Sequence, residues 1–329
     1  MSTAADGRRY IPYSERTGNE SIVYFTRDLS AEGIAKIYER INAYICGKTA
    51  IKLHTGEPQG PNIIPSAWVK SFMEKELPDA TIIETNTFYK GDRYTTEQHR
   101  KTLEVNGWSS FTTVDITDEF GTTMLPVKGG KWFTEMSVGK SLPTYDSLVV
   151  LTHFKGHTMG GFGGSNKNIG IGCADGRIGK GMIHAKNGND WGVVEEELME
   201  KISESTKATI DYFGKHVTYV NVMRNMSVSC DCEGVAAQPV VTPNVGIVGS
   251  VDILAADQAC VDMVASLGSE FPRDLFQRME SRHGFRQLSY MKELGMGNDR
   301  YILIDIDNGD SRIAAADAVK GVVPFRITK

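Results

Sequence analysis

The sequence has few cysteines, no excess of basic residues and no long apolar run. Its 329 residues include five cysteines, and because no secretory signal accompanies this odd number we expect no disulfide framework. The 36 lysines and arginines are outnumbered by 41 acidic residues, and the net charge of −5 argues against a nucleic-acid-binding protein. No stretch approaches the roughly 18 apolar residues of a membrane helix, and the start lacks the apolar core of a signal peptide. We therefore expect a cytoplasmic protein without a membrane segment.

Several catalytic and binding motifs are also missing. The chain has no Gly-x-Ser-x-Gly elbow, no His-Glu-x-x-His helix and no EF-hand loop. Gly161-x-Gly163 is not a dinucleotide fingerprint, because Asn166 stands where the third glycine would be. The function must therefore be read from less standard groups of residues.

Apolar runs of strand length alternate with segments of helical periodicity along most of the chain. This alternation predicts an α/β fold with a mainly parallel sheet and crossover helices. We expect residues 1–20 to form a polar N-terminal arm and residues 21–329 to form the α/β region, as one body or two lobes without a visible boundary. Strands are expected at 21–25, 49–53, 80–85, 148–151, 217–222, 245–248 and 301–306, and helices at 30–45, 65–76, 95–106, 190–214 and 252–267.

The stretch 148–175 carries the strongest functional signal. An apolar run at 148–151 is followed by His153, Lys155 and His157, at the strand end where open α/β sheets bind ligands. A glycine-rich segment follows, and glycines suit positive φ angles or close approach of the backbone to a ligand. Because histidine, lysine, asparagine and cysteine meet in this segment, we interpret it as a site, with a plain strand-to-helix connection as the alternative.

A second polar segment, 225–234, contains two cysteines two residues apart. On an extended chain Cys230 and Cys232 would point the same way. Thiolate and imidazole together suit a soft or borderline metal such as iron, nickel or zinc, or an iron–sulfur cluster. We expect a metal or cluster on some subset of His153, His157, Cys173, Cys230 and Cys232. The alternative is that these cysteines are packed thiols and the histidines contact an organic ligand.

The lysines of the same stretch predict an anion or cofactor site. Consecutive N–H groups of a glycine loop can hold a carboxylate or phosphate, and lysines beside them add positive charge. The predicted contacts are Lys155, Gly161, Gly163, Gly164, Asn166 and Lys167. A lysine next to histidine can also act as a nucleophile or base. Secondary candidates on the same sheet edge are His54, Glu57 and Tyr89, whereas His99, His184, His216 and His283 are expected to be structural.

Three segments in order resemble the DUF362 family of uncharacterised α/β proteins. They are HFKGHTMGGFGGSNKNIGIGCADGRIGK, NVMRNMSVSCDCEG and GIVGSVDILAADQACVDMV, and the resemblance covers roughly residues 20–306. Some members of that family carry a ferredoxin-like iron–sulfur module. This chain lacks the C-x2-C-x2-C-x3-C-P run of such a module, so a cluster would need other ligands.

The segment from His157 to Lys167 also resembles, more distantly, the nickel-pincer lactate racemases. That family has a segment His-x-x-Ala-Gly-aromatic-Ser/Thr-Gly-Gly-x-Lys, which HTMGGFGGSNK matches in spacing. The resemblance implies that Lys167 tethers a cofactor and that His157 is a ligand or base. The Thr-Gly-Thr-His motif of those racemases has no counterpart in the comparable stretch 84–89. The resemblance therefore supports a shared fold and pocket location more than shared chemistry.

Together these patterns favour an enzyme that acts on a small anionic metabolite of the hydroxy- or keto-acid class. It would be a metal- or iron–sulfur-dependent oxidoreductase or isomerase, with His157 and Lys167 as catalytic residues and a redox partner if the chemistry is oxidative. The alternatives are a non-catalytic metal or iron–sulfur carrier or maturation protein, and a ligand-binding protein without metal. A carrier should expose its ligands, whereas an enzyme should enclose them in a pocket.

Overall fold

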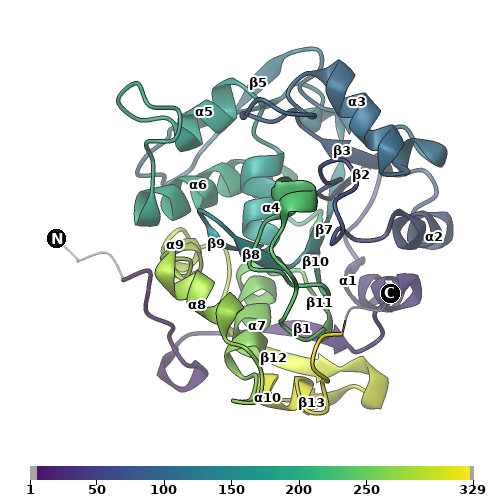
Figure 1. The fold of residues 1–329 in the computed structure, drawn as a ribbon, viewed down its shortest axis with the longest axis vertical. Coiled ribbons are helices and arrows are strands. Elements are labelled where there is room, and N and C mark those ends of the chain that lie inside the picture. The colour runs from purple at the N-terminus through teal and green to yellow at the C-terminus, as the bar shows by residue number, and fades with distance from the viewer. Residues whose placement is uncertain (1–5, 327–329) are drawn as a thin grey trace.

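The computed structural model describes residues 6–326, and nine of its strands form one sheet (Figure 1). Across the sheet the strands follow the order β13-β12-β1-β11-β10-β7-β2-β3-β4. Their bounds are β1 Glu20–Thr26, β2 Thr49–Lys52, β3 Thr81–Glu84, β4 Asp115–Ile116, β7 Ser147–His153, β10 Val217–Met223, β11 Gly246–Ser250, β12 Arg300–Asp305 and β13 Ser311–Ile313. Two hairpins stand apart from this sheet: β5 Thr122–Pro126 with β6 Glu135–Gly139, and β8 Lys155–His157 with β9 Gly161–Gly163.

Most of the sheet is parallel, as the alternation of strands and helices predicts. β4, β3, β2, β7 and β10 pair in parallel, and so do β1 and β12. Only β11 and β13 run against the other strands of this sheet. The strands β2, β3, β7 and β10 therefore end at one edge, which places the segments that follow them side by side.

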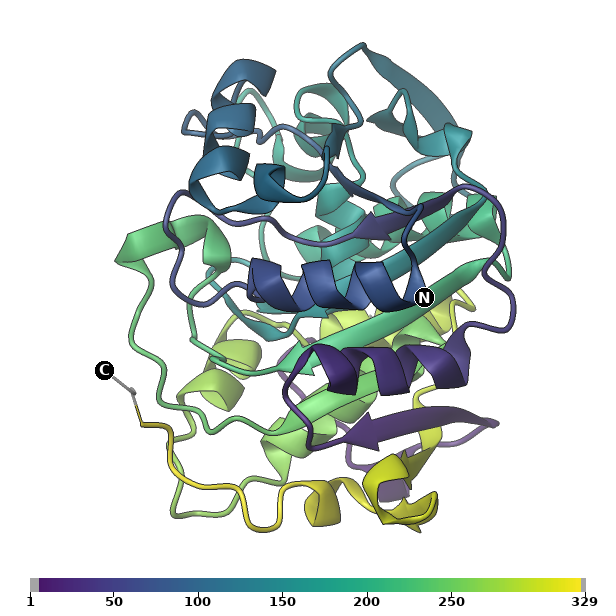
Figure 2. The same ribbon diagram turned by 90° about the vertical axis from the view of Figure 1, so that its right-hand side faces the viewer.

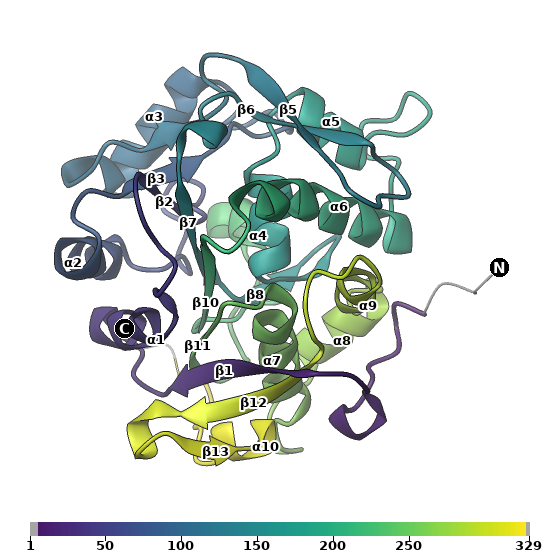
Figure 3. The same cartoon turned by 180° about the vertical axis from the view of Figure 1, so that it is seen from behind.

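Helices cover both faces of the sheet (Figures 1 and 3). The helices on one face are α1 Ala31–Ile41, α2 Ser66–Glu76 and α3 Thr96–Val105, and Figure 2 shows α1 and α2 lying across the strands. Those on the other are α4 Ser165–Gly172, α5 Ile178–His184, α6 Glu195–Phe213, α7 Ile253–Ala265, α8 Asp274–Ser281 and α9 Arg286–Glu293, and a short α10 Ala315–Ala318 follows β13.

Alternating strand side chains feed two separate cores. Ile51 and Val149 pack with Ile37 and Phe72 of α1 and α2. Their neighbours in the strands, such as Val150, face the opposite core with the helices that follow β9. This alternation is the period of two that strand geometry imposes, and it buries the sheet on both faces.

The glycine-rich segment differs from the loop that the sequence predicts. It forms the hairpin strand β9 and then the helix α4. Gly161 has a φ of +75°, which favours glycine, and a Cβ at Gly170 would lie 2.4 Å from the carbonyl oxygen of Ile202 in α6. These glycines serve a tight hairpin and a close helix–helix contact, so the segment is ordered by packing.

The chain before β1 lies against the C-terminal half of the molecule. The guanidinium of Arg16 makes two hydrogen bonds with the buried carboxylate of Asp262, at 2.6 and 2.7 Å. The hydroxyls of Tyr10 and Tyr301 donate to the same carboxylate. A buried ion pair with every acceptor satisfied fixes the path of this segment.

Among residues 6–326, no helix is both long enough and apolar enough to span a membrane.

Candidate functional site

A cavity of about 360 Å³ lies at the edge where β2, β3, β7 and β10 end. Its walls come from the segments after these strands, from the hairpin β8–β9, and from α4, α5 and α6. Ligand sites at the carboxyl ends of parallel strands are the rule in open α/β sheets. Four of the predicted residues that line it are Lys155, His157, Lys167 and Cys230.

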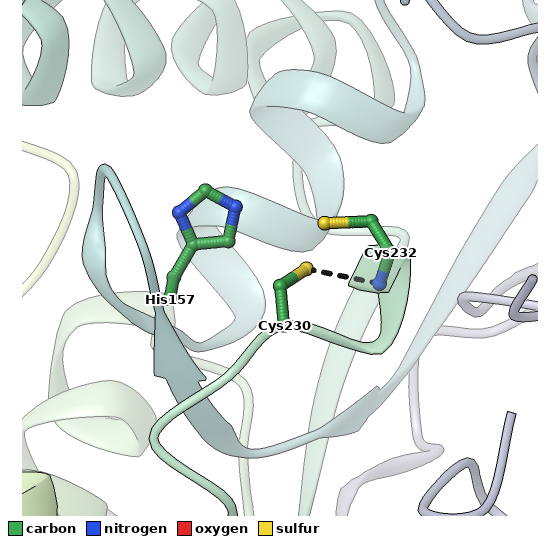
Figure 4. Close-up of side chains that lie close together, drawn as sticks. All are labelled: His157, Cys230 and Cys232. Atoms are coloured by element: carbon green, nitrogen blue, oxygen red, sulfur yellow. Dashed lines mark hydrogen bonds between the residues drawn. The ribbon is translucent and has the colours of Figure 1, made fainter. Parts of the chain in front are cut away.

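His157, Cys230 and Cys232 converge in this cavity (Figure 4). One ligand atom from each lies within 4.8 Å of the others. His157 ends β8, and the two cysteines begin the 3-10 helix η4 Asp231–Ala236, where the sulfur of Cys230 accepts from the N–H of Cys232 at 3.3 Å. Two sulfurs and one imidazole therefore meet at a single point, although they come from distant parts of the sequence.

The ring of His157 has a defined tautomer. Its Nδ1 accepts the backbone N–H groups of Met159 at 3.2 Å and Gly160 at 2.8 Å. A neutral imidazole with an accepting Nδ1 carries its proton on Nε2. Figure 4 shows one ring nitrogen turned toward the sulfurs of Cys230 and Cys232, and this nitrogen is Nε2. Burial lowers the pKa of His157, as does the charge of Lys167, so the ring is held neutral.

The two thiols ionise in sequence. A hydrogen bond from Cys232 holds the pKa of Cys230 well below its usual value, and the charge of Lys167 and a hydrogen bond from His157 act in the same direction. The pKa of Cys232 is raised by the same hydrogen bond and by burial. The pair therefore presents one thiolate and one thiol, and the second proton leaves only with difficulty.

His153 is placed differently from the metal ligand that the sequence predicts. Its Nδ1 lies 2.7 Å from a carboxylate oxygen of Asp231 and its Nε2 lies 2.7 Å from the carbonyl oxygen of Arg224. Because both ring nitrogens are engaged by these oxygens, neither is free to bind a metal. Asp231 also pairs with Lys155 at 3.0 Å, and its contacts with His153 and Lys155 outweigh burial and hold the pKa of Asp231 well below the usual range.

The structure separates Cys173 from the other predicted ligands. Cys173 follows α4, is buried, and does not line the cavity. Burial raises the pKa of its thiol to about 12, so it stays protonated. It is a packed thiol, whereas Cys230 and Cys232 both line the cavity.

The predicted backbone anion site is already occupied by a side chain of the protein. The carboxylate of Asp257 accepts the N–H groups of Ser165 at 2.7 Å and Asn166 at 2.9 Å, at the start of α4. The amide of Asn166 points into the core toward Ser203 and Gln287, and Gly161 packs against residue 284. Gly163 and Gly164 line the cavity, but Asn166 and Gly161 do not.

A buried ionic network that sequence reasoning missed forms another part of the cavity wall. Glu84, the last residue of β3, lies 3.0 Å from Lys52 and 3.5 Å from Arg93. The sequence offers one signal for it, because charged residues end the otherwise apolar runs of β2 and β3. The secondary candidates join this network: His54 lies 3.4 Å from Glu84, and Glu57 accepts from both Tyr89 and Arg93.

Two further lysines line the cavity. Lys167 is partly buried and has no ion-pair or hydrogen-bond partner for its ammonium within residues 6–326. Lys180, which sequence reasoning missed, donates to Thr85 and to the carbonyl oxygen of Asn86, and burial lowers its pKa to about 8. Among the described residues, Lys167 is therefore the cavity lysine whose ammonium has neither an ion pair nor a hydrogen bond, which suits an anionic ligand.

A family model described as a domain of unknown function, DUF362, matches residues 49–262. The chain belongs to the DUF362 family. This confirms the resemblance found in the three sequence segments, and the matched region contains His157, Lys167, Cys230 and Cys232. No curated protein matches the sequence.

Solved structures give weaker similarities. The apoprotein of lactate racemase from Thermoanaerobacterium thermosaccharolyticum aligns with 12% identity over 95% of this chain and 93% of that one, with a TM-score of 0.39. A Thermotoga maritima protein aligns with 14% identity over 58% of this chain and 49% of its own length, with a TM-score of 0.38. At such scores neither structure informs the chemistry of the cavity.

Proposed function

We propose that this DUF362 protein is a metal-dependent enzyme acting on a small anionic metabolite of the hydroxy- or keto-acid class. The observation that carries the proposal is the convergence of His157, Cys230 and Cys232 inside a cavity that also holds the unpaired Lys167. Soft donors, a proton-bearing imidazole and a free cation are the three parts that such a reaction needs.

The donor set fits a single soft or borderline ion. Cys230 and Cys232 supply the sulfurs, with one thiolate already favoured by its surroundings. A ligating histidine normally donates its other N–H, but Nδ1 of His157 accepts hydrogen bonds instead. We therefore assign the two cysteines as ligands and His157 as the neighbouring hydrogen-bond donor, acting through the N–H at Nε2. Iron, nickel and zinc all accept thiolate ligands.

An iron–sulfur cluster fits the same residues less well. Such clusters usually take four cysteine ligands. Within residues 6–326 only Cys230 and Cys232 meet, because Cys173 is packed beside α4, Cys260 is buried in α7, and Cys46 is exposed elsewhere. A mononuclear ion is the proposal that these positions support.

Burial of the ligands favours an enzyme over a metal carrier. Cys230 is 4% exposed and Cys232 is half-buried, and both line the cavity. A carrier that hands its metal to a partner would need ligands within reach of that partner. Here the free space lies beside the ligands, where a substrate can sit.

Different residues around the cavity would have different roles in the reaction. Lys167 would hold the substrate carboxylate, since Lys155 is already paired with Asp231. A bound ion would polarise the substrate oxygen as a Lewis acid. The N–H at Nε2 of His157 would donate to the substrate oxygen and stabilise negative charge that develops there, and the hydrogen bonds to Nδ1 keep the ring oriented for that contact.

Metal analysis of protein purified without oxygen tests the first part of this proposal. We expect a transition metal close to one per chain, lost in Cys230→Ser and Cys232→Ser. Cys46→Ser is the matched control, because Cys46 is exposed and far from the cavity, and it should keep the metal. Metal-free wild-type protein after reconstitution with iron, nickel and zinc would contradict the proposal.

Binding measurements test the anion site. Calorimetry with a panel of 2-hydroxy and 2-keto acids should give dissociation constants that Lys167→Met raises on the order of tenfold, the effect of one charge-assisted contact. Lys128→Met, at an exposed lysine outside the cavity, serves as the control. Unchanged binding in Lys167→Met would remove the assigned role of Lys167.

A further inference from the structure

Three rings that the proposed chemistry does not use line the same cavity: Phe88, His184 and Trp191. Their centroids lie 6.2 Å apart for Phe88 and His184, 4.9 Å for His184 and Trp191, and 5.3 Å for Phe88 and Trp191. Phe88 and His184 are nearly parallel, with an interplanar angle of 16°. We call these three residues the aromatic wall.

Specific hydrogen bonds fix the loop that carries Trp191. Lys186 and Asn189 exchange two backbone hydrogen bonds, and the side chain of Asn189 accepts from the N–H of Trp191 at 2.9 Å. Val193 then donates to the carbonyl oxygen of His184 at 3.0 Å, which folds the 185–194 loop back onto α5. The side chain of Trp191 is nonetheless 39% exposed, so this ring spans the cavity rim.

His184 has an unmet hydrogen-bonding need at this wall. It is 7% exposed, and its Nδ1 has no partner among residues 6–326. Burial lowers the pKa of His184 to about 3, and the nearby charge of Lys167 lowers it as well. The ring is therefore neutral and offers a polar atom to a ligand without attracting an anion.

The cavity is also larger than a three-carbon acid requires. Its volume of about 360 Å³ falls in the range, roughly 300–1,000 Å³, of sites for ring-sized organic ligands. The same cavity is lined by the apolar side chains of Met159, Ile171, Leu198 and Ile202. An ammonium group, rings and apolar side chains in one cavity match a ligand that joins an anion to an apolar ring.

We infer that the substrate is an aryl-substituted hydroxy or keto acid whose planar ring stacks on the aromatic wall while its carboxylate meets Lys167. This inference rests on the proposed function and names the substrate class for the same site. Offset or edge-to-face stacking on Phe88 and Trp191 would supply selectivity, and the free Nδ1 of His184 would accept or donate to a polar group on the ring side.

The test compares the dissociation constants of lactate, 3-phenyllactate and 3-cyclohexyllactate by calorimetry. Wild-type protein should bind phenyllactate about tenfold or more tightly than lactate, and more tightly than the non-planar cyclohexyl acid. Trp191→Ala should cut the preference for phenyllactate to about threefold and leave lactate binding unchanged, and Trp191→Phe should restore most of the preference. Trp132→Ala, at a partly buried tryptophan outside the cavity, is the control.

Three outcomes would overturn the inference. They are equal affinities for lactate and phenyllactate in the wild type, an equal loss of both in Trp191→Ala, and tighter binding of adenosine monophosphate, which also joins a planar ring to an anion. Metal content is measured on the same samples. If the protein binds metal but does not prefer phenyllactate over lactate, only the role of the aromatic wall is contradicted. If it prefers phenyllactate but contains no metal, only the metal proposal is contradicted.

Discussion

The carboxylate of Asp257 accepts a hydrogen bond from the backbone N–H of Ser165 at 2.7 Å, across the start of α4. Its second oxygen accepts from Asn166 at 2.9 Å, and the side chain of Asn221 donates at 2.9 Å. A residue of α7 thus caps a helix 92 positions earlier in the chain. Because Lys167 is the next residue of α4, this contact also sets where Lys167 enters the cavity.

The pKa of Asp257 gives a prediction of pH-dependent stability. Burial raises it from 3.8 to about 6, so the folded protein binds more protons than the unfolded chain between these values. The contribution of Asp257 to stability is therefore fully present below the unfolded pKa and falls as pH rises toward 6. The difference in unfolding free energy between wild type and Asp257→Ala should be larger at pH 4.5 than at 7.5, by roughly 1–3 kcal/mol. Denaturant titrations at both pH values measure it, and a larger difference at pH 7.5 would contradict the assignment.

Lys180 should titrate far below the other lysines. Burial lowers its pKa to about 8, against 10.5 for a free lysine. NMR of protein with labelled lysine side chains should show one ammonium with a midpoint near 8, absent in Lys180→Met. The folded chain binds fewer protons in this window, so the contribution of Lys180 to stability increases as pH rises above 8. A spectrum in which every lysine titrates above 10 would refute this prediction.

The ion pair of Arg16 and Asp262 should contribute most of the stability with which the segment before β1 is held against the rest of the protein. Both side chains are almost fully buried, at 1% and 5% exposure. Arg16→Ala leaves a buried carboxylate without its cation and should cost about 3–5 kcal/mol of unfolding free energy. Arg9→Ala breaks the exposed pair with Glu15 in the same segment and should cost under about 1 kcal/mol. Equal losses of unfolding free energy in the two variants would contradict this prediction.

The roles assigned to His157 and Cys230 separate in one experiment. His157→Gln should retain the metal but lower turnover by about a hundredfold or more, since it removes the imidazole N–H that faces the substrate oxygen. Turnover is followed by NMR as exchange of the C2 proton of an aryl hydroxy acid with solvent deuterium. His153→Asn should keep the metal, because both nitrogens of His153 are already engaged by Asp231 and Arg224. Loss of metal in His157→Gln would make His157 a ligand instead.

Local patterns explain which parts of the fold could be predicted. The sheet follows from apolar runs such as residues 148–151, and α7 follows from the helical pattern at 252–267. α4 could not be predicted, because its glycines disfavour a helix. The helix depends on the cap from Asp257 and on close packing against α6, and both are contacts between distant residues.

The sequence indicated the kind of site but not all of the residues that form it. The segments with His157, Lys167 and Cys230 were identified from polar residues after apolar strands, and they meet in one cavity. Sequence cannot tell a packed thiol such as Cys173 from a cavity thiol, because both sit beside glycine-rich turns. His184 was expected to be structural, yet it lines the cavity, since its position depends on how α5 and the 185–194 loop fold back.

X-ray absorption at the edge of the bound metal tests the central claim most directly. We expect a single ion with two sulfur neighbours at about 2.3 Å, the usual zinc–thiolate distance, and nitrogen or oxygen atoms as its other neighbours. Both sulfur neighbours should disappear together with the metal in Cys230→Ser and persist in Cys173→Ser. A metal surrounded only by nitrogen and oxygen, or a short metal–metal distance from a cluster, would contradict a mononuclear site on Cys230 and Cys232.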